Sequence, residues 1–463
     1  MADGKIPSEL GTKKISTLLK EYAVPGIIAM TASSLYNMVD SIYIGHIPDV
    51  GSLSIAGLAV CFPLMNLSTA LGTLVGVGAA TMISVLLGKK DYDKANTVLA
   101  NEVTLNILVG LLFSVVSLVF LGPILRFFGA SEAILPYASS YMKVILYGNI
   151  ITHLYFGLNS VIRSSGNPRL AMGLTLFTVT SNAILDPVFI YVFGMGIQGA
   201  AWATVLCQLM ALAYTMRYFM DEKRFLHLPR KVISLDWGIA KESLAIGMGP
   251  FLMNSASCIV AIFINQQLQE YGGDMAIGAY GINNRLSFLF FMVTMGINHG
   301  MQPIAGYNYG ARQYSRVRAV YLLAAKWATF IMFLGFVVSV FLPRAAVSIF
   351  TSDPQLIDVA SRGLRIMNIV FPIIGFQAIA TNLFQCLGMV RKSVILSLSR
   401  QLLFLVPCVY LLPLWIGVDG VWVSFPVSDM LATVLTVIYL SGLMRKLGRL
   451  RDGDDPAILG SSI

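Results

Sequence analysis

Long runs of apolar residues dominate this chain and leave few folds open to it. Of the 463 residues, 56% are hydrophobic and 12% are charged, and the mean hydropathy is +0.75. A helix needs about 20 apolar residues to cross a bilayer. The runs divide into twelve expected spans, at residues 22–44, 54–87, 103–125, 138–162, 171–192, 197–219, 244–268, 276–306, 319–343, 363–388, 393–412 and 419–444. The sequence therefore predicts an all-α polytopic membrane protein with twelve transmembrane helices.

Lysine and arginine are distributed unevenly among the segments between these spans. The N-terminus, the connections after even-numbered spans and the C-terminus hold 23 of the 32 Lys and Arg residues, whereas the other connections hold 3. Because cytoplasmic loops retain positive charge, we expect both termini in the cytoplasm and the chain in the cell (inner) membrane. The net charge of +9 then reflects topology and contact with membrane lipid, and we expect no nucleic-acid partner.

Neither the N-terminus nor the cysteines indicate processing or metal chemistry. The first twenty residues contain no apolar core before a small-residue cleavage site, so no removable signal peptide is expected. The five cysteines lie in apolar segments without metal-like spacing. We therefore expect no disulfide, no metal cluster and no cofactor.

The two halves of the chain repeat one another. The loop that begins at Gly88 after span 2 is echoed by the loop that begins at Gly310 after span 8. Other landmarks keep nearly the same offset, namely Pro25 and Pro250, Phe128 and Phe350, Asn159 and Asn382, Gly166 and Gly388, and Trp202 and Trp422. An offset that is nearly constant over the whole length indicates a duplication. Six spans in each copy give both copies the same orientation, as in transporters that bind their cargo between two halves.

This repeat predicts two pseudo-symmetric six-helix bundles around a central cavity. The expected organisation is an N-lobe at residues 1–219 with spans 1 to 6, a cytoplasmic linker at 220–243, a C-lobe at 244–444 with spans 7 to 12, and a cytoplasmic tail at 445–463. The basic linker is the longest polar connection in the chain, so it is the natural boundary between the lobes.

Two carboxylates inside the apolar spans, Asp40 and Asp186, are the strongest functional signal. A single Asp at the centre of a membrane helix costs about 2.5 to 3.5 kcal/mol, so such residues are seldom kept without a use. Tyr36 and Asn37 precede Asp40 by four and three residues and share its helix face, and Asn182 precedes Asp186 by four. Two such acids can share a proton or hold Na⁺ together. The alternative is a packed polar pair.

Prolines and other polar residues within the spans allow structural interpretations as well. Pro187 cannot donate to the helix ladder and frees a carbonyl one turn earlier that a cation could use, but it could equally produce a simple kink. Arg285, Arg400 and Asp429 lie in the expected second lobe and are expected to form internal ion pairs. His153 is expected to be a hydrogen-bonded core residue rather than a proton relay.

These motifs together resemble those of the multidrug and toxic compound extrusion (MATE) transporters, over essentially the whole chain. The resemblance rests on the duplicated six-span copies, Pro25, Tyr36-Asn-Met-Val-Asp40, the Gly88-Lys-Lys-Asp-Tyr loop, Arg163-Ser-Ser-Gly166-Asn-Pro-Arg and Asn182-Ala-Ile-Leu-Asp186-Pro187. It is strongest to the DinF and MepA branch, which implies a cation site for H⁺ or Na⁺ at Asp40, Asn182, Asp186 and Thr204. Tyr36, Asn37 and Asn159 are the expected cavity residues, and Pro25 and Pro187 the expected helix-bending residues.

The resemblance also implies a function, which is antiport rather than enzymatic catalysis. H⁺ or Na⁺ would enter as a small organic cation or another lipophilic substrate leaves, and the protein would act as a monomer. The NorM branch uses acids in spans 7 and 10, whereas neither expected span contains one here. We therefore do not expect a second-lobe sodium site of that type.

Two other functions agree less well with the residues. A lipid-linked oligosaccharide flippase of the same superfamily should line its cavity with several basic residues, but the first-lobe spans contain only Lys143 and Arg217, both near a membrane edge. An intramembrane aspartyl protease would also pair two acids, yet the Gly-x-Gly-Asp surround is missing and Asp186 is followed by Pro187. A channel is disfavoured because the sequence shows neither a ring of charges nor a carbonyl filter signature.

Overall fold

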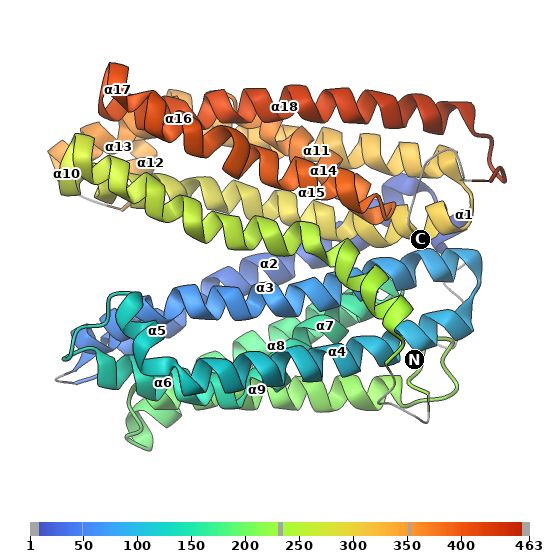
Figure 1. Cartoon of the computed structure of the whole chain (residues 1–463), viewed down its shortest axis with the longest axis horizontal. Helices are drawn as coiled ribbons and strands as arrows, with labels where there is room; N and C mark the ends of the chain where they lie inside the picture. Colours follow the sequence, from blue (N-terminus) through green and yellow to red (C-terminus); the bar gives the residue numbers. More distant parts are fainter. Residues whose placement is uncertain (1–8, 49, 230–234, 351–352, 456–463) are drawn as a thin grey trace. The chain divides into compact units, whose positions relative to one another are not determined.

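The computed structural model describes residues 9–48, 50–229, 235–350 and 353–455. Within these ranges the chain forms helices and no strands (Figure 1). The first half comprises α1 (Glu9–Thr12), α2 (Ile15–Gly45), α3 (Gly51–Lys89), α4 (Tyr92–Val119), α5 (Leu121–Phe127), α6 (Leu135–Tyr147), α7 (Asn149–Ser164), α8 (Pro168–Pro187), the π-helical turn η1 (Val188–Val192) and α9 (Ile197–Phe219).

The second half repeats this pattern of long helices and broken ones. It comprises α10 (Trp237–Gly310), α11 (Tyr314–Phe341), α12 (Pro343–Ser348), α13 (Pro354–Met367), α14 (Phe371–Cys386), α15 (Val390–Leu398), the π-helical segment η2 (Ser399–Leu405), α16 (Val406–Leu411), α17 (Pro413–Ile416) and α18 (Val418–Arg449). The long α10 contains a break at Gly273, where φ is 62° and ψ is −164°. Glycine adopts a positive φ without a steric penalty, so this residue separates the expected spans 7 and 8.

Each of the twelve expected spans lies in a helix or in consecutive helices. Among the described residues, eight helices are long and apolar enough to cross a membrane. The number is nine if α13 and α14, which are bent by 52° at their junction, form one broken span. The remaining expected spans 1, 4 and 8 correspond to α2, to α6 with α7, and to the part of α10 beyond Gly273.

The helices pack into two compact units. Unit 1 contains Met1–Leu10 and Ile28–Phe251, and unit 2 contains Gly11–Ile27 and Leu252–Ile463. The two units therefore divide α2 and α10, and each division falls shortly after a proline, Pro25 in α2 and Pro250 in α10. The contiguous lobe boundaries expected from the sequence stay a prediction.

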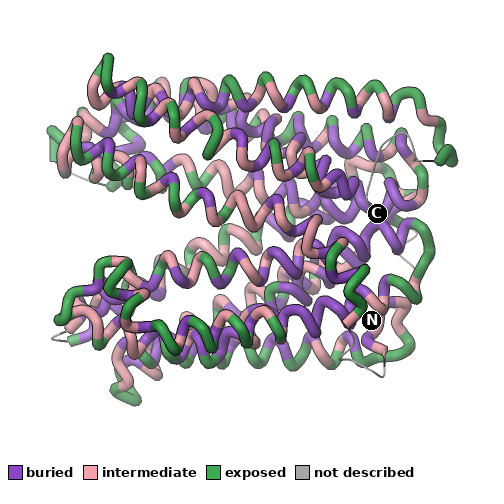
Figure 2. Tube along the Cα trace, viewed as in Figure 1, coloured by how far each residue is buried: buried purple, intermediate pink, exposed green. Residues whose placement is uncertain are grey.

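Each unit has an apolar interior of its own. In unit 1 the core gathers around residues such as Ile44, Tyr141 and Ala200, and in unit 2 it gathers around Trp422, which is 1% exposed. Figure 2 shows buried residues along the sides on which the helices of each unit pack. Because a lipid chain is as apolar as Leu, such side chains stabilise the units through van der Waals packing between helices.

The two halves of α4 differ in the side chains that they expose and bury. Its second half exposes a band of large apolar side chains, Leu111, Leu112, Val115, Val116 and Val119, with exposed fractions between 48% and 69%. These exposed apolar side chains agree with the length and hydropathy of α4, which suffice for it to cross a membrane. Its first half instead buries polar side chains against neighbouring helices.

The end of the described chain folds back onto the start of α11 in unit 2. The carboxylate of Asp452 accepts hydrogen bonds from the backbone N–H of Ser315 at 2.9 Å and from its hydroxyl at 2.5 Å. The hydroxyl of Tyr314 donates to the backbone carbonyl of Asp454 at 2.8 Å. Because Gln313 provides no side-chain cap, Asp452 satisfies a first-turn N–H of α11 that the local sequence leaves free.

Candidate functional site

Polar side chains from α2, α8 and α9 meet inside unit 1. Asp40 on α2 is 6% exposed, while Asn182 and Asp186 on α8 are 2% and 0% exposed. Tyr36 lies one turn before Asp40, and Thr204 comes from α9. All four residues expected to hold the cation therefore lie in unit 1, and three of them are buried.

The hydroxyl of Thr204 joins the three helices. It accepts a hydrogen bond from Asn182 Nδ2 at 3.2 Å and shares a second one with the Tyr36 hydroxyl at 2.8 Å. A hydroxyl has one proton and two acceptor lone pairs, so Thr204 can satisfy both neighbours at once. This contact fixes the position of Tyr36 on α2 relative to Asn182 on α8.

The two acids lie close to the Tyr36 hydroxyl that Thr204 contacts, and most of their carboxyl oxygens have no hydrogen-bond donor. Asp40 and Asp186 are close enough for their carboxyl groups to interact directly. Within the described residues, both carboxyl oxygens of Asp186, Asp40 Oδ1 and Asn182 Oδ1 have no hydrogen-bond partner. Four buried acceptor atoms without a donor are costly, because buried charges need a partner or a bound cation. The arrangement can hold a proton between the carboxyl groups or a small cation among the oxygens.

The local sequence of α8 explains why its acid projects here. Asn182 and Asp186 are one helical turn apart, so they share a face. The helix ends at Pro187 and continues into η1, where the N–H of Phe193 donates to the carbonyl of Val188 at 2.9 Å. Proline has no N–H to donate, so the regular hydrogen-bond ladder is interrupted directly after Asp186. Short π-helical segments of this kind often occur at functional sites.

The sequence matches a known family twice. The MatE family model aligns with residues 25–188 and again with residues 245–411, which together cover more than half of the chain. The chain belongs to the MATE family. The two matches are of nearly equal length and fall one in each half of the chain, so they show the same duplication as the landmark pairs.

Several characterised proteins are similar to this MATE protein over nearly its full length. The multidrug export protein MepA of Staphylococcus aureus (strain MSSA476) is 28% identical over 425 residues, which are 91% of this chain and 93% of MepA. The structure of the MATE multidrug transporter DinF-BH in complex with rhodamine 6G is 36% identical with a TM-score of 0.87, covering 95% of this chain and 98% of DinF-BH.

A more distant structural relative is a MOP superfamily transporter from Pyrococcus furiosus, with 23% identity and a TM-score of 0.89. The match covers 97% of this chain and 100% of that one. These similarities confirm the twelve-span, two-bundle fold. The MATE protein is therefore a multi-pass membrane transporter and not an enzyme.

The structure brings together most, but not all, of the expected site residues. Asn159 on α7 is 9% exposed and donates from Nδ2 to the Thr175 hydroxyl at 3.1 Å, so this contact is with α8 and not with the acid pair. The side chain of Asn37 lies outside the described part of the molecule. Pro25 lies within α2, in the stretch of this helix that belongs to unit 2.

Sequence reasoning missed two residues near the acids of this MATE protein. Tyr141 on α6 is 2% exposed and lies within electrostatic reach of Asp40 and Asp186. Cys207 on α9 lies near Asp186 and is 1% exposed. Cys207 could have been found, because it follows Thr204 by three residues and shares its helix face. Tyr141 carries no such signal, since only the tertiary fold places α6 beside α2.

In unit 2 the buried acid already has a counter-charge. Arg400 Nε in η2 donates to Asp429 Oδ1 in α18 at 2.5 Å, and the side chain of Asp429 is 3% exposed. This confirms the internal ion pair expected from the sequence. Because Asp429 is neutralised by Arg400, it is not comparable with the donor-free acids of unit 1.

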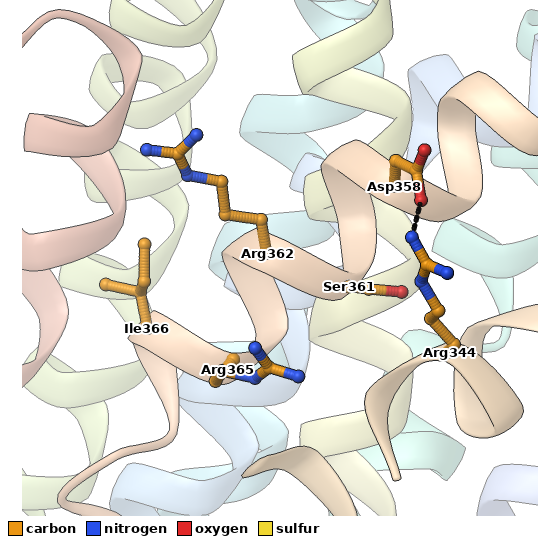
Figure 3. A pocket seen from close by; sticks show the side chains of 6 residues that line it. All are labelled: Arg344, Asp358, Ser361, Arg362, Arg365 and Ile366. Atoms are coloured by element: carbon orange, nitrogen blue, oxygen red, sulfur yellow. Dashed lines mark hydrogen bonds and ion pairs between the residues drawn. The ribbon is translucent and has the colours of Figure 1, made fainter. Parts of the chain in front are cut away.

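A hollow of about 420 Å³ lies elsewhere in unit 2, between α12 and α13 (Figure 3). Its lining is basic: Arg344 bonds Asp358 at 2.7 Å, Arg362 bonds Asp419, and Arg365 Nε donates to the Val340 carbonyl at 3.2 Å. The one carboxylate among these lining residues, that of Asp358, is already paired with Arg344. The hollow therefore offers no donor-free carboxylate for a cation, unlike the cluster in unit 1.

Proposed function

We propose that this protein exports lipophilic, often cationic drugs or metabolites by antiport with H⁺ or Na⁺. The coupling ion would bind at Asp40, Asn182, Asp186 and Thr204, and no further cofactor is required. MepA is a multidrug export protein and DinF-BH was solved with rhodamine 6G bound, which supports this class of substrate. The protein would act as a monomer in the cell (inner) membrane, in contact with lipid and with both termini in the cytoplasm.

The observation that carries the proposal is the set of donor-free oxygens. Asp40 and Asp186 are buried and interact directly, and no basic side chain among the described residues pairs with either of them. Two carboxylates side by side repel one another, so an added proton or Na⁺ is held favourably. A permanently charged organic cation gains from the same negative charge. Ion and substrate therefore compete for the same electrostatic attraction.

This competition provides coupling without any further chemistry. A ligand shifts a conformational equilibrium only through its differential affinity for the two states. Binding of the ion removes charge from the Asp40 and Asp186 pair, so it favours whichever state binds the organic cation less tightly. Pro25 interrupts the backbone hydrogen bonds of α2, the helix that carries Asp40, and is a natural bending point.

The experiment that tests the proposal is transport in proteoliposomes. Transport of rhodamine 6G would be followed under a pH gradient alone, a Na⁺ gradient alone and no gradient. We expect transport under at least one imposed gradient and none without. Asp358→Asn, which changes an exposed carboxylate of unit 2, is the matched control for Asp40→Asn. Transport that ignores both gradients would refute the antiport proposal.

A further inference from the structure

A third buried carboxylate in unit 1, besides Asp40 and Asp186, is that of Glu102. Glu102 sits in the first half of α4 and is 1% exposed. Asn101, Thr104 and Asn106 on the same stretch are 1%, 5% and 0% exposed. From the start of α4 at Tyr92, Glu102 lies about 15 Å along the helix axis at 1.5 Å per residue. Glu102 therefore lies well within the length of α4 rather than in its first turn.

The contacts of Glu102 leave its charge unbalanced. Asn106 Nδ2 donates to Glu102 Oε1 at 2.6 Å, while Glu102 Oε2 and Asn106 Oδ1 have no hydrogen-bond partner among the described residues. Within the same residues, no ion pair includes Glu102. An isolated carboxylate in such a place is far more costly to bury than a neutral carboxylic acid.

The facing helix α7 has a glycine, Gly157, next to the Glu102 carboxyl group. A Cβ atom on Gly157 would overlap Glu102 Oε1 and lie 2.5 Å from Asn106 Nδ2. A Cβ on Gly76 of α3 would in turn lie 2.6 Å from Gly157 Cα. The α4 carboxyl group therefore lies directly against the α7 backbone at Gly157, and α7 lies against α3 at the same residue.

The other titratable groups on the helices around Glu102 do not pair with its carboxylate. On α7, His153 lies one turn before Gly157, with Nε2 3.1 Å from the Ser68 hydroxyl and Nδ1 without a partner among the described residues. Arg163 lies six residues beyond Gly157, about 240° round the helix, and its Nη2 bonds Ser160. On α3 the charged side chain is Lys89 at its last residue, and on α4 the nearest ones are Asp93 and Lys94 in its first turn. The start of α10 packs against α4 near Leu105, and the charged residues there are Asp236, Lys241 and Glu242. Among the described residues, no ion pair joins Lys241 to Glu102.

We propose that Glu102 is a second proton-binding site of this protein, separate from Asp40 and Asp186, which carries a proton in the described arrangement and exchanges it during transport. The geometry of the Asn106 contact agrees with this. Its 2.6 Å is short for N–H···O, which averages about 2.9 to 3.0 Å, and closer to O–H···O at about 2.7 to 2.8 Å. With the Asn106 amide in its other orientation, the acid proton of Glu102 donates to Oδ1.

Exchange at this site is a simple proton transfer. The O–H bond of the Glu102 carboxyl breaks, the proton passes to a water molecule as hydronium, and a carboxylate remains. The carboxylate then needs water or a donor at Oε2, so release of the proton requires α4 and α7 to loosen at Gly157. The presence of the proton does not depend on the proposed antiport, but its exchange during transport does.

Infrared spectroscopy of the purified protein at neutral pH tests the site directly, because a protonated carboxyl has a C=O stretch well separated from that of a carboxylate. We expect a protonated-carboxyl band in the wild type that loses the contribution of one carboxyl group in Glu102→Gln, whether or not the Asp40 and Asp186 pair contributes to the same band. Glu132→Gln is the matched control, because Glu132 is 82% exposed and paired with Arg126, and it should leave the band in place. Identical bands in the wild type and Glu102→Gln would overturn the proposal.

Transport then tests whether the proton is exchanged. We expect Glu102→Gln to bind rhodamine 6G as the wild type does but to lose part of the pH dependence of its gradient-driven transport. An unchanged pH dependence would refute the proposal that Glu102 exchanges its proton during transport. If Glu102→Gln does not fold, Glu102→Asp keeps the acid and should shift its contribution to the infrared band rather than remove it. The infrared measurement needs no transport, so it separates failure of this site from failure of the proposed antiport.

Discussion

The packing of α7 against α4 makes a sharp prediction for Gly157→Ala. The added methyl would overlap Glu102 Oε1 and lie 2.5 Å from Asn106 Nδ2, well inside the 3.4 Å at which ordinary contacts begin. The ends of the Glu102 and Asn106 side chains are flexible, but both residues are buried, at 1% and 0% exposure, so they have little space into which to turn away. Overpacking of this kind costs about 1 to 3 kcal/mol. We expect Gly157→Ala to unfold at a clearly lower temperature in detergent.

The matched control is Gly173→Ala on α8, where a Cβ would meet nothing within 4 Å. Alanine is favoured over glycine inside a helix by about 1 kcal/mol, so this variant should be as stable as the wild type or more stable. A second test combines Gly157→Ala with Glu102→Ala, which removes the clashing carboxyl. The double variant should recover part of the loss, with a coupling of about 0.5 to 3 kcal/mol. Equal unfolding temperatures for the two glycine variants would refute the packing argument.

Three further predictions concern the buried and capping acids. Asp40→Asn and Asp186→Asn should each abolish gradient-driven transport of rhodamine 6G while the protein stays folded, and normal transport by both variants would reject the pair as the coupling site. Asp429→Asn should destabilise unit 2, towards the lower end of about 3 to 5 kcal/mol because Arg400 is 31% exposed, and Arg400→Gln added to it should restore stability in thermal unfolding. Partial burial raises the pKa of Asp452, but the hydrogen bonds from Ser315 and Tyr314 together with the charge of Arg316 hold the pKa below its ordinary value. Its stabilising effect should therefore be full above about pH 4 and fade as the pH falls further. The unfolding temperatures of the wild type and Asp452→Asn should converge in acid, and a constant difference would contradict the assignment.

The sequence predicted the acid pair because its signal is local. Asp40 and Asp186 interrupt apolar runs, and Asn182 lies one turn from Asp186, so composition and helical period were enough to find them. Tyr141 reaches the same cluster only through the packing of α6, which no local pattern encodes. Glu102 was missed for a different reason: it falls one residue before the expected start of span 3, where a carboxylate looks like part of a cytoplasmic loop.

The sequence marked where the backbone irregularities lie but not what form they take. Pro187 predicted an interruption but not its form, which is the π-helical turn η1 rather than a simple kink. Pro407 is the comparable residue in the second half, because it lies in the first turn of α16 directly after η2, which presents Arg400 to Asp429. The bend between α13 and α14 lies beside Pro372, in the first turn of α14. Prolines therefore mark these breaks, but their geometry is set by the fold.

The cap that Asp452 places on α11 has a consequence for how the protein is made. Asp452 lies 137 residues beyond Ser315, whose N–H and hydroxyl it binds. During synthesis α11 is therefore made long before its cap exists, and its first turn stays incomplete until the ribosome has added 137 further residues. Unit 2 can reach its final form only after Asp452 has been made, and a chain cut before Asp452 would keep that turn open.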